Sequence, residues 1–188
     1  MTPETVVDRQ LVYTGRKIQV AVEEITTPEG RSVRRDVVIH PGAVVILPII
    51  DACHVVLLRN YRFIVQETLW EVPAGTLEAG EEPQAAAIRE LAEETGYRAA
   101  RWRYHGFVYA SPGVLTEKMH LFFALDLTPG PAQPEAGEHL QAVTLPLTQA
   151  LDMVRRGEIH DAKTVAALLL WDRFYATELT PSNLTARA

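Results

Sequence analysis

The sequence has 188 residues, of which 47% are apolar and 22% charged, so it is long enough for one globular domain with a substantial core. Its formal net charge of −6 argues against a non-specific binder of nucleic acid or of an anionic membrane. Cys53 is the single cysteine, which excludes an intrachain disulfide, and we expect it to be a small buried residue. The sequence has neither a membrane-spanning apolar run nor a signal-peptide pattern, so we expect a cytoplasmic protein.

The first predicted unit is a small antiparallel β-sheet within residues 1–41. Residues 1–9 are polar and are expected to lie outside it, and three segments have the pattern of strands: Leu11–Tyr13, Lys17–Ile25 and Ser32–Ile39. A sheet of this size buries too little against itself to be stable alone. A covering surface, either on the same chain or on a second copy, is therefore expected over Val20, Val22, Val37 and Ile39.

Residues 42–180 are predicted to form the main domain, followed by a flexible tail at residues 181–188. Strand patterns occur at 43–50, 54–59, 69–72, 102–109, 119–127 and 140–145. A helix is expected over 83–95, a second from an N-cap at Thr148 to Arg156, and a third from a cap at Asp161 to about Thr177. Strands followed by mixed strands and helices indicate an α/β sandwich with a mixed sheet.

The stretch from Gly75 to Tyr97 has the most informative chemistry. Pro83 suits the first turn of a helix, and Gly96 is placed to end it. At about 100° per residue, one side of this helix carries Glu90, Glu93 and Glu94, and the opposite side carries Ile88, Leu91 and Ala92. Clusters of carboxylate oxygens suit hard cations such as Mg²⁺ or Mn²⁺.

Two neighbours extend this acidic face. Glu81 lies just upstream and could turn a fourth carboxylate toward it, and Arg89 lies one turn before Glu93 and could hold that carboxylate by a bidentate contact. From helix periodicity alone, the alternative is an acidic face that is merely solvated.

The whole stretch resembles the Nudix box, the signature G-x5-E-x7-R-E-U-x-E-E-x-G-U of Nudix hydrolases, in which U is a bulky aliphatic residue. It departs from the signature only at the last position, where Tyr97 replaces the usual Ile, Leu or Val, and matches it at Gly75, Glu81, Arg89, Glu90, Leu91, Glu93, Glu94 and Gly96. The resemblance implies a Nudix α/β/α sandwich and a bound divalent cation, Mg²⁺ or Mn²⁺. It implies metal ligands among Glu90, Glu94, Glu93 and Glu81, with the Ala74 carbonyl as a further ligand.

Segments outside the box resemble the ADP-ribose pyrophosphatase group of this family. Arg59-Asn60-Tyr61-Arg62 and the following Trp70-containing segment resemble the group's approach to the box, where an arginine at the position of Arg62 contacts substrate. Trp70 could stack on an adenine or simply pack. The group has a proline about fifteen residues beyond the box, here Pro112, in a loop that also contains Glu117. We expect these side chains, Arg59 included, to line the substrate site or to be ordinary surface residues.

The general base is sought in the loop before the last strand. Glu138 aligns with a glutamate that in relatives holds metal or positions the attacking water, and Glu135 is the alternative. Relatives often have another acid two residues before the position of Glu138, where this chain has Ala136, so the base could also be a box glutamate.

The resemblance implies hydrolysis of the diphosphate linkage of a nucleoside diphosphate sugar, with ADP-ribose giving AMP and ribose 5-phosphate as the first expectation. Alternatives are GDP-mannose, a dinucleoside polyphosphate, and a non-catalytic module that senses a nucleotide. A homodimer is expected, because this group commonly exchanges the N-terminal segment between two subunits. His120 is interpreted as a satisfied core group, and Trp171 and Phe174 as core or interface residues.

Overall fold

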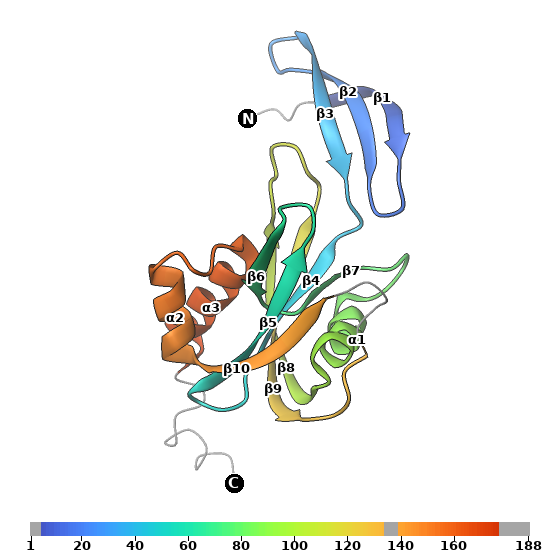
Figure 1. The fold of residues 1–188 in the computed structure, drawn as a ribbon. Helices are drawn as coiled ribbons and strands as arrows, with labels where there is room; N and C mark the ends of the chain where they lie inside the picture. The colour runs from blue at the N-terminus through green and yellow to red at the C-terminus, as the bar shows by residue number, and fades with distance from the viewer. Residues whose placement is uncertain (1–4, 134–138, 177–188) are drawn as a thin grey trace.

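The computed structural model describes residues 5–133 and 139–176, and Figure 1 shows their arrangement. Helices are formed by α1 (Pro83–Thr95), α2 (Leu147–Arg155) and α3 (Ala162–Phe174). Strands are β1 (Thr5–Thr14), β2 (Gln19–Thr26), β3 (Ser32–Ile39), β4 (Ala43–Pro48), β5 (His54–Arg62), β6 (Glu67–Glu71), β7 (Ala74–Thr76), β8 (Arg98–Tyr109), β9 (Lys118–Thr128) and β10 (Leu140–Pro146). The expected α/β architecture with a small N-terminal antiparallel sheet is confirmed.

The body is a sandwich built around strand β4. One sheet has the order β7-β4-β9-β8, in which β4 and β9 are parallel, and a second has the order β10-β5-β6. Residues Val44 and Ile46 of β4 face α1, where they pack with Ala87 and Leu91. Alternate residues of the same strand, Val45 among them, belong to the larger core that includes α2 and α3. Because both faces of β4 are covered, its sequence is apolar throughout rather than alternating.

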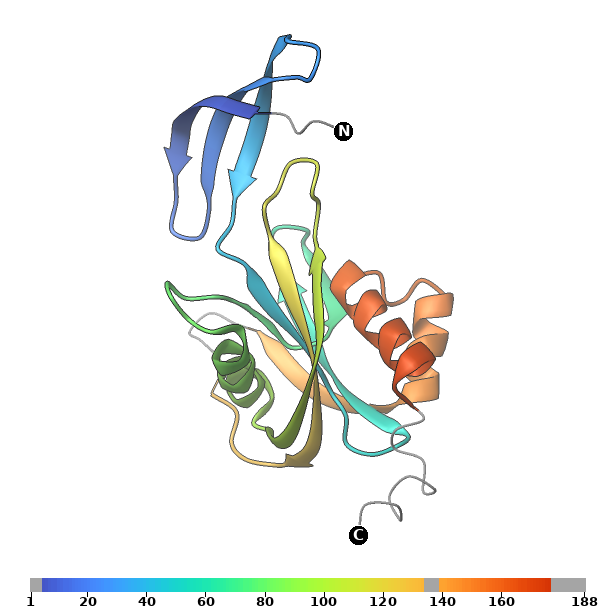
Figure 2. The ribbon, with the colours of Figure 1, turned by 180° about the vertical axis from the view of Figure 1, so that it is seen from behind.

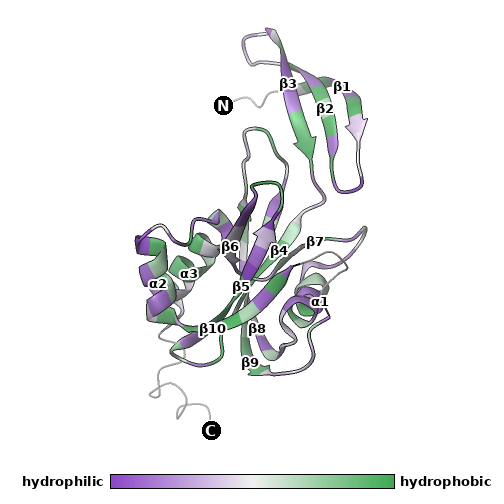
Figure 3. Ribbon diagram, viewed as in Figure 1, coloured by the Kyte–Doolittle hydropathy of each residue, from purple (hydrophilic) through white to green (hydrophobic). Residues whose placement is uncertain are grey.

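The N-terminal sheet has the order β1-β2-β3 and stands away from the body in both ribbon views (Figures 1 and 2). Strand β3 changes from hydrophilic to hydrophobic toward the body (Figure 3). At that end Val38 donates to the Val114 carbonyl (2.8 Å) and accepts from the Thr116 amide (3.0 Å). These main-chain bonds tie the small sheet to the loop between β8 and β9.

Some local expectations were wrong. Strand β1 begins at Thr5, inside the segment expected to be loose, because it pairs with β2 along its whole length. Cys53 is exposed, since it lies in the tight connection between β4 and β5, where its N–H donates to Asp51. Helix α2 begins at Leu147 rather than after a Thr148 cap, and Pro146 precedes it.

The buried side of α1 also differs from the expectation. Ile88 is 45% exposed, whereas Ala86, Ala87 and Leu91 are fully buried, so the apolar stripe is rotated by one residue. Strand β7 was not expected as a strand; it pairs with β4 just before the Nudix-like stretch continues into its loop. The expected cap of α3 is confirmed, because the Asp161 side chain accepts from the Thr164 amide (3.1 Å). In the described part of the chain, no helix is long and apolar enough to cross a membrane.

Candidate active site

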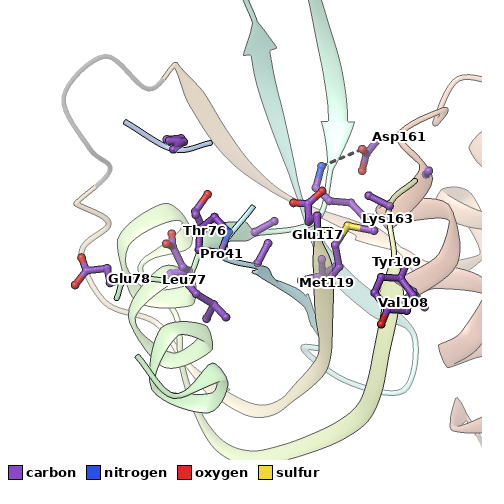
Figure 4. Close-up of a pocket in the computed structure, with 18 of the residues that line it drawn as sticks. Pro41, Thr76, Leu77, Glu78, Val108, Tyr109, Glu117, Met119, Asp161 and Lys163 are labelled. Atoms are coloured by element: carbon purple, nitrogen blue, oxygen red, sulfur yellow. Dashed lines mark hydrogen bonds and ion pairs between the residues drawn. The ribbon is translucent and has the colours of Figure 1, made fainter. Parts of the chain in front are cut away.

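A cleft of about 1050 Å³ opens between the beginning of α3 and the segment that joins β7 to α1 (Figure 4). We call its two sides the α1 wall (Ala74, Gly75, Arg89, Glu90 and Glu94) and the α3 wall (Arg62, Asp161 and Lys163). The floor comes from β4, β8 and β9, including Val45, Val108 and Met119. The turn between β1 and β2 adds Arg16 and Lys17 at the same cleft.

Two carboxylates of the α1 wall lie against strand β7. Glu94 is 5% exposed, and one of its oxygens accepts from the Ala74 amide (2.9 Å). The Glu90 carboxylate lies so close to Gly75 that a Cβ added there would overlap it. Glu90 and Glu94 are one helical turn apart, so both acidic groups lie on the same side of α1, beside the backbone of β7.

Arg89 collects the other box carboxylates. It binds Glu81 with two N–H groups (both 3.0 Å) and reaches Glu90 (2.7 Å) and Glu93 (3.0 Å) through Nη1. The hydrogen bonds that Arg89 donates lower the pKa of Glu81 below its ordinary value, and their acceptance by the three carboxylates raises the pKa of Arg89. The bidentate partner of Arg89 is thus Glu81, whereas Glu93 receives a single bond.

The donor chemistry of the α1 wall fits a hard divalent cation. Glu90 and Glu94 present oxygen atoms beside the backbone of β7, and oxygen is the ligand that Mg²⁺ and Mn²⁺ prefer. Among the residues that the structure describes, no group of three or more His, Cys, Asp or Glu side chains is arranged to hold a metal ion. A cation held by Glu90 and Glu94 alone would keep positions for water and for substrate phosphates.

The α3 wall is held by an ion-pair network around Glu71. Arg62 binds the Glu71 carboxylate through Nε (2.9 Å) and Nη2 (2.5 Å), and Lys163 binds the same carboxylate (3.2 Å) and that of Asp161 (2.9 Å). Glu71 is 2% exposed. Burial alone would raise the pKa of Glu71, but the hydrogen bonds and charges of Arg62 and Lys163 lower it below the ordinary value. The carboxylate is therefore held in its charged form.

Sequence reasoning missed three members of this network: Glu71, Lys163 and the Asp161 carboxylate as an ion-pair partner. One available signal was a charged residue, Glu71, within a short apolar strand. The other was the spacing of Asp161, Lys163 and Thr164 at the start of a helix. Arg62 was expected at the substrate site and lines the cleft, but it is paired with Glu71 rather than projecting alone from the strand.

The other residues named from the sequence fall into three places. Glu117 lines the cleft, 3.7 Å from His40. Pro112 borders a smaller hollow with Val37, outside the main cleft. Arg59 lies over the Trp70 ring (4.8 Å to its centroid), and this pair does not line the cleft in the described part of the chain.

A few further assignments can be compared with the structure. Glu135 and Glu138 lie outside the described residues. His120 is half-buried and lies 2.9 Å from the Tyr104 hydroxyl, which fits a satisfied structural imidazole. Trp171 is buried in the core as expected, whereas Phe174 is 63% exposed.

Comparison with known proteins decides the family. The NUDIX domain family model matches residues 39–168. The chain belongs to the Nudix family. An ADP-ribose pyrophosphatase of Bacillus subtilis (strain 168) is 35% identical over 167 residues, which cover 88% of this chain and 90% of the relative.

Two further relatives agree with this placement. A GDP-mannose pyrophosphatase of Citrobacter koseri (strain ATCC BAA-895 / CDC 4225-83 / SGSC4696) is 38% identical over 136 residues, covering 68% of this chain and 71% of the relative. A crystal structure of an ADP compounds hydrolase superposes with a TM-score of 0.80 at 26% identity, covering 95% of this chain and 97% of that chain. Nudix hydrolases generally need a divalent metal ion, and the carboxylates of the α1 wall are suited to one.

Proposed function

We propose that this Nudix protein hydrolyses the diphosphate linkage of a nucleoside diphosphate sugar, with ADP-ribose as the preferred substrate and AMP and ribose 5-phosphate as products. One observation supports this most directly: the paired carboxylates Glu90 and Glu94 face a cleft whose other wall carries Arg62 and Lys163. Such a cleft offers ligands for cations on one side and guanidinium and ammonium groups for phosphate oxygens on the other. Similarity to the ADP-ribose pyrophosphatase of Bacillus subtilis supports the choice of substrate.

Glu90 and Glu94, together with the Ala74 carbonyl, are proposed to hold Mg²⁺, with Mn²⁺ as a substitute. A bound divalent cation would neutralise charge on the diphosphate and favour ionisation of a nearby water. Glu81 and Glu93 are proposed to act mainly through Arg89, because their contacts to it fix the guanidinium beside Glu90. Arg89 would thereby keep the Glu90 carboxylate in place for its ligand role.

The proposed reaction is direct attack of water on one phosphorus of the diphosphate. The bond between that phosphorus and the bridging oxygen breaks, and the proton of the attacking water passes to a carboxylate. We assign that base to Glu138, with Glu135 as the alternative. Arg62 is proposed to bind the phosphate oxygens and Glu117 to position substrate from the cleft. Arg59, Trp70 and Pro112 do not line the cleft that the described residues form, and they are proposed to contact the part of the substrate that extends beyond it.

The assignment of the base can be tested by two matched substitutions. Glu138→Gln should lower kcat at least about tenfold with a much smaller change in KM, because a base acts in the transition state. Glu135→Gln is the matched control, three positions earlier in the sequence. A larger loss of kcat for Glu135→Gln would exchange the two roles, and full activity of both variants would place the base among the box glutamates.

The substrate itself is tested by a panel. The full-length protein is assayed with ADP-ribose, GDP-mannose and a dinucleoside polyphosphate, each with Mg²⁺, Mn²⁺ or a chelator, and the products are identified. The GDP-mannose arm has specific support, because a GDP-mannose pyrophosphatase is 38% identical to this chain. Turnover of GDP-mannose at a higher kcat/KM would reassign the substrate, and no metal-dependent turnover of any compound would favour a non-catalytic nucleotide sensor.

We also propose that residues 1–41 form a dimerisation extension of a hydrolase domain at residues 42–180. Every residue of β1 is exposed, and its apolar side chains Val6, Val7, Leu11 and Val12 are about half exposed. The valines expected to need cover, including Val20 and Val22 of β2, are only partly buried. A second copy packed on this sheet would bury them, and a homodimer interface of that kind typically exceeds about 2,000 Å².

Light scattering of the full chain at micromolar concentration tests the dimer. Twice the chain mass of 20.9 kDa is expected, and a stable mass of 20.9 kDa would show that the monomer is the native state. Deleting residues 1–40 should abolish the dimer and weaken substrate binding, because Arg16 and Lys17 are lost from the cleft. The negative net charge supports a small-molecule substrate rather than a nucleic acid or membrane partner, and the cytoplasm is the proposed location.

A further inference from the structure

We propose that Glu71 is a positioning residue, which orients Arg62 toward the substrate diphosphate and is itself paired with Lys163 at the start of α3. The inference rests on the proposed function and adds to it residues that the Nudix box does not contain. Glu71 does not line the cleft, whereas both of its cationic partners do. Its effect on the reaction therefore has to pass through these partners, of which Arg62 makes the two-bond contact to Glu71.

The geometry of the Arg62 guanidinium supports this role. Its Nε and one hydrogen of Nη2 are taken by the two oxygens of Glu71. The second edge of the fork, formed by Nη1 and the other Nη2 hydrogen, makes no hydrogen bond within the described part of the chain, and the side chain is 44% exposed. A guanidinium fixed by one edge presents the other edge to a phosphate in a bidentate arrangement. Glu71 thus determines which way the free edge of Arg62 points.

Lys163 provides a second positive charge that helps to stabilise the buried, charged carboxylate of Glu71. Glu71 is 2% exposed, and a buried ion with a partly exposed partner would be poorly compensated. Lys163, whose side chain is 15% exposed, adds a second cation, and Asp161 adds the second carboxylate, so two positive and two negative groups balance. The backbone of Lys163 is fixed in turn, because Asp161 caps α3 through the amide and hydroxyl of Thr164.

The same short segment of chain sets both walls of the cleft. Glu71 holds Arg62, and three residues later the Ala74 amide holds Glu94. The segment between them is fixed to α3, because the Val72 amide donates to the Thr164 hydroxyl (2.8 Å). The contacts of this one segment therefore fix the position of Arg62 relative to the proposed metal-binding carboxylates. If the ion pair of Arg62 and Glu71 were purely structural, the guanidinium of Arg62 would not need to keep its second edge toward the cleft.

The test is a double-mutant cycle on the full-length protein. Arg62→Ala should raise KM for ADP-ribose at least about tenfold, and Glu71→Gln should raise it about tenfold with kcat within about threefold. In the Arg62→Ala background, Glu71→Gln should add less than about twofold, because the residue through which it acts is gone. Independent effects that multiply in the double variant would overturn the inference, as would an unchanged KM in Glu71→Gln.

Two companion variants separate positioning from folding. Asp126→Asn removes a carboxylate from an exposed arginine pair of similar bidentate geometry, Arg101 with Asp126, and should leave KM within about twofold. Asparagine also tolerates the positive φ of 56° at that position. Glu71→Gln combined with Lys163→Met removes one anion and one cation, so it keeps the charge balance. Because Lys163 itself lines the cleft, the double variant is compared with Lys163→Met alone, over which it should still raise KM about tenfold. Unfolding of both Glu71 variants would show a structural role and overturn the inference.

Binding of ADP, measured by calorimetry, distinguishes this inference from the proposed function. If the wild-type protein binds ADP but hydrolyses no nucleoside diphosphate sugar, the proposed function fails. The double-mutant cycle is then measured on the Kd for ADP, and the effects of the two substitutions should again be non-additive. If the wild type is active and the cycle is additive, the function stands and the inference fails. A wild-type protein that neither hydrolyses these compounds nor binds ADP would contradict both.

Discussion

The two walls of the cleft are built in different ways. The α1 wall comes from one continuous stretch in which a helix places Glu90 and Glu94 against the strand that precedes it. The α3 wall is assembled from Arg62 at the end of β5, Glu71 at the end of β6, and Lys163 at the start of α3. The first wall needs only local geometry, whereas the second exists only once three separate elements have packed together.

The largest expected effect follows from removing one acid of the α1 wall. Glu94→Gln, or Glu90→Gln, should lower kcat/KM at least about a hundredfold, because a charged metal ligand is lost. The free energy of unfolding should change by less than about 1 kcal/mol in Glu94→Gln, since the oxygen of the introduced amide can still accept from the Ala74 N–H. Steady-state kinetics and denaturant unfolding measure the two quantities.

Glu158→Gln is the control for this loss of charge, because Glu158 is an exposed acid paired with Arg156 outside the cleft. Near-wild-type turnover of Glu94→Gln at saturating Mg²⁺ would remove Glu94 from the metal site. A loss of activity accompanied by unfolding would instead show that the α1 wall serves stability as much as chemistry.

The contrast between the walls also explains what the sequence could predict. Pro83, Gly96 and the spacing of Glu90 and Glu94 are local signals, and the helix has the predicted bounds. The rotation of its buried side away from Ile88 could not be predicted, because the choice depends on where β4 and β9 lie beneath it. Glu71 carries no local signal of its partners, since Lys163 is 92 positions away. Ion pairs between distant elements require the tertiary fold.

A smaller effect, on stability, is expected at the α3 wall. Thr164→Val keeps the shape of a fully buried side chain but leaves the Val72 amide without its acceptor and Asp161 without a hydroxyl donor. The unfolding free energy should fall by about 1–3 kcal/mol. Thr148→Val, on the exposed side of α2, is the control and should change stability by less than about 0.5 kcal/mol. Equal stability of the two variants would contradict the role of the Val72 bond.

The smallest expected effect is a dependence on pH. The pKa of Glu71 is lowered on folding, so its contribution to stability is complete above the ordinary value of 4.5 and is lost as the pH falls through the lower value of the folded state. The difference in unfolding free energy between wild type and Glu71→Gln should therefore be largest near neutral pH and shrink below pH 4.5. Denaturant titrations at several pH values measure it, with Asp126→Asn as the control. A difference that does not change with pH would mean that Glu71 is not the group being titrated.

The contact between Gly75 and Glu90 has a consequence for reading other sequences of this family. Gly75 is absent from the glycines of this chain with positive φ, so an alanine could adopt its backbone conformation. What an alanine Cβ would meet is the end of the Glu90 side chain, which would have to swing aside and leave β7. The residue types at the two positions are therefore coupled, because the glycine is needed only while the Glu90 carboxylate has to lie beside β7. A relative that has replaced the glycine should also have shortened or lost the acid, and that joint change would mark it as a protein that has given up hydrolysis.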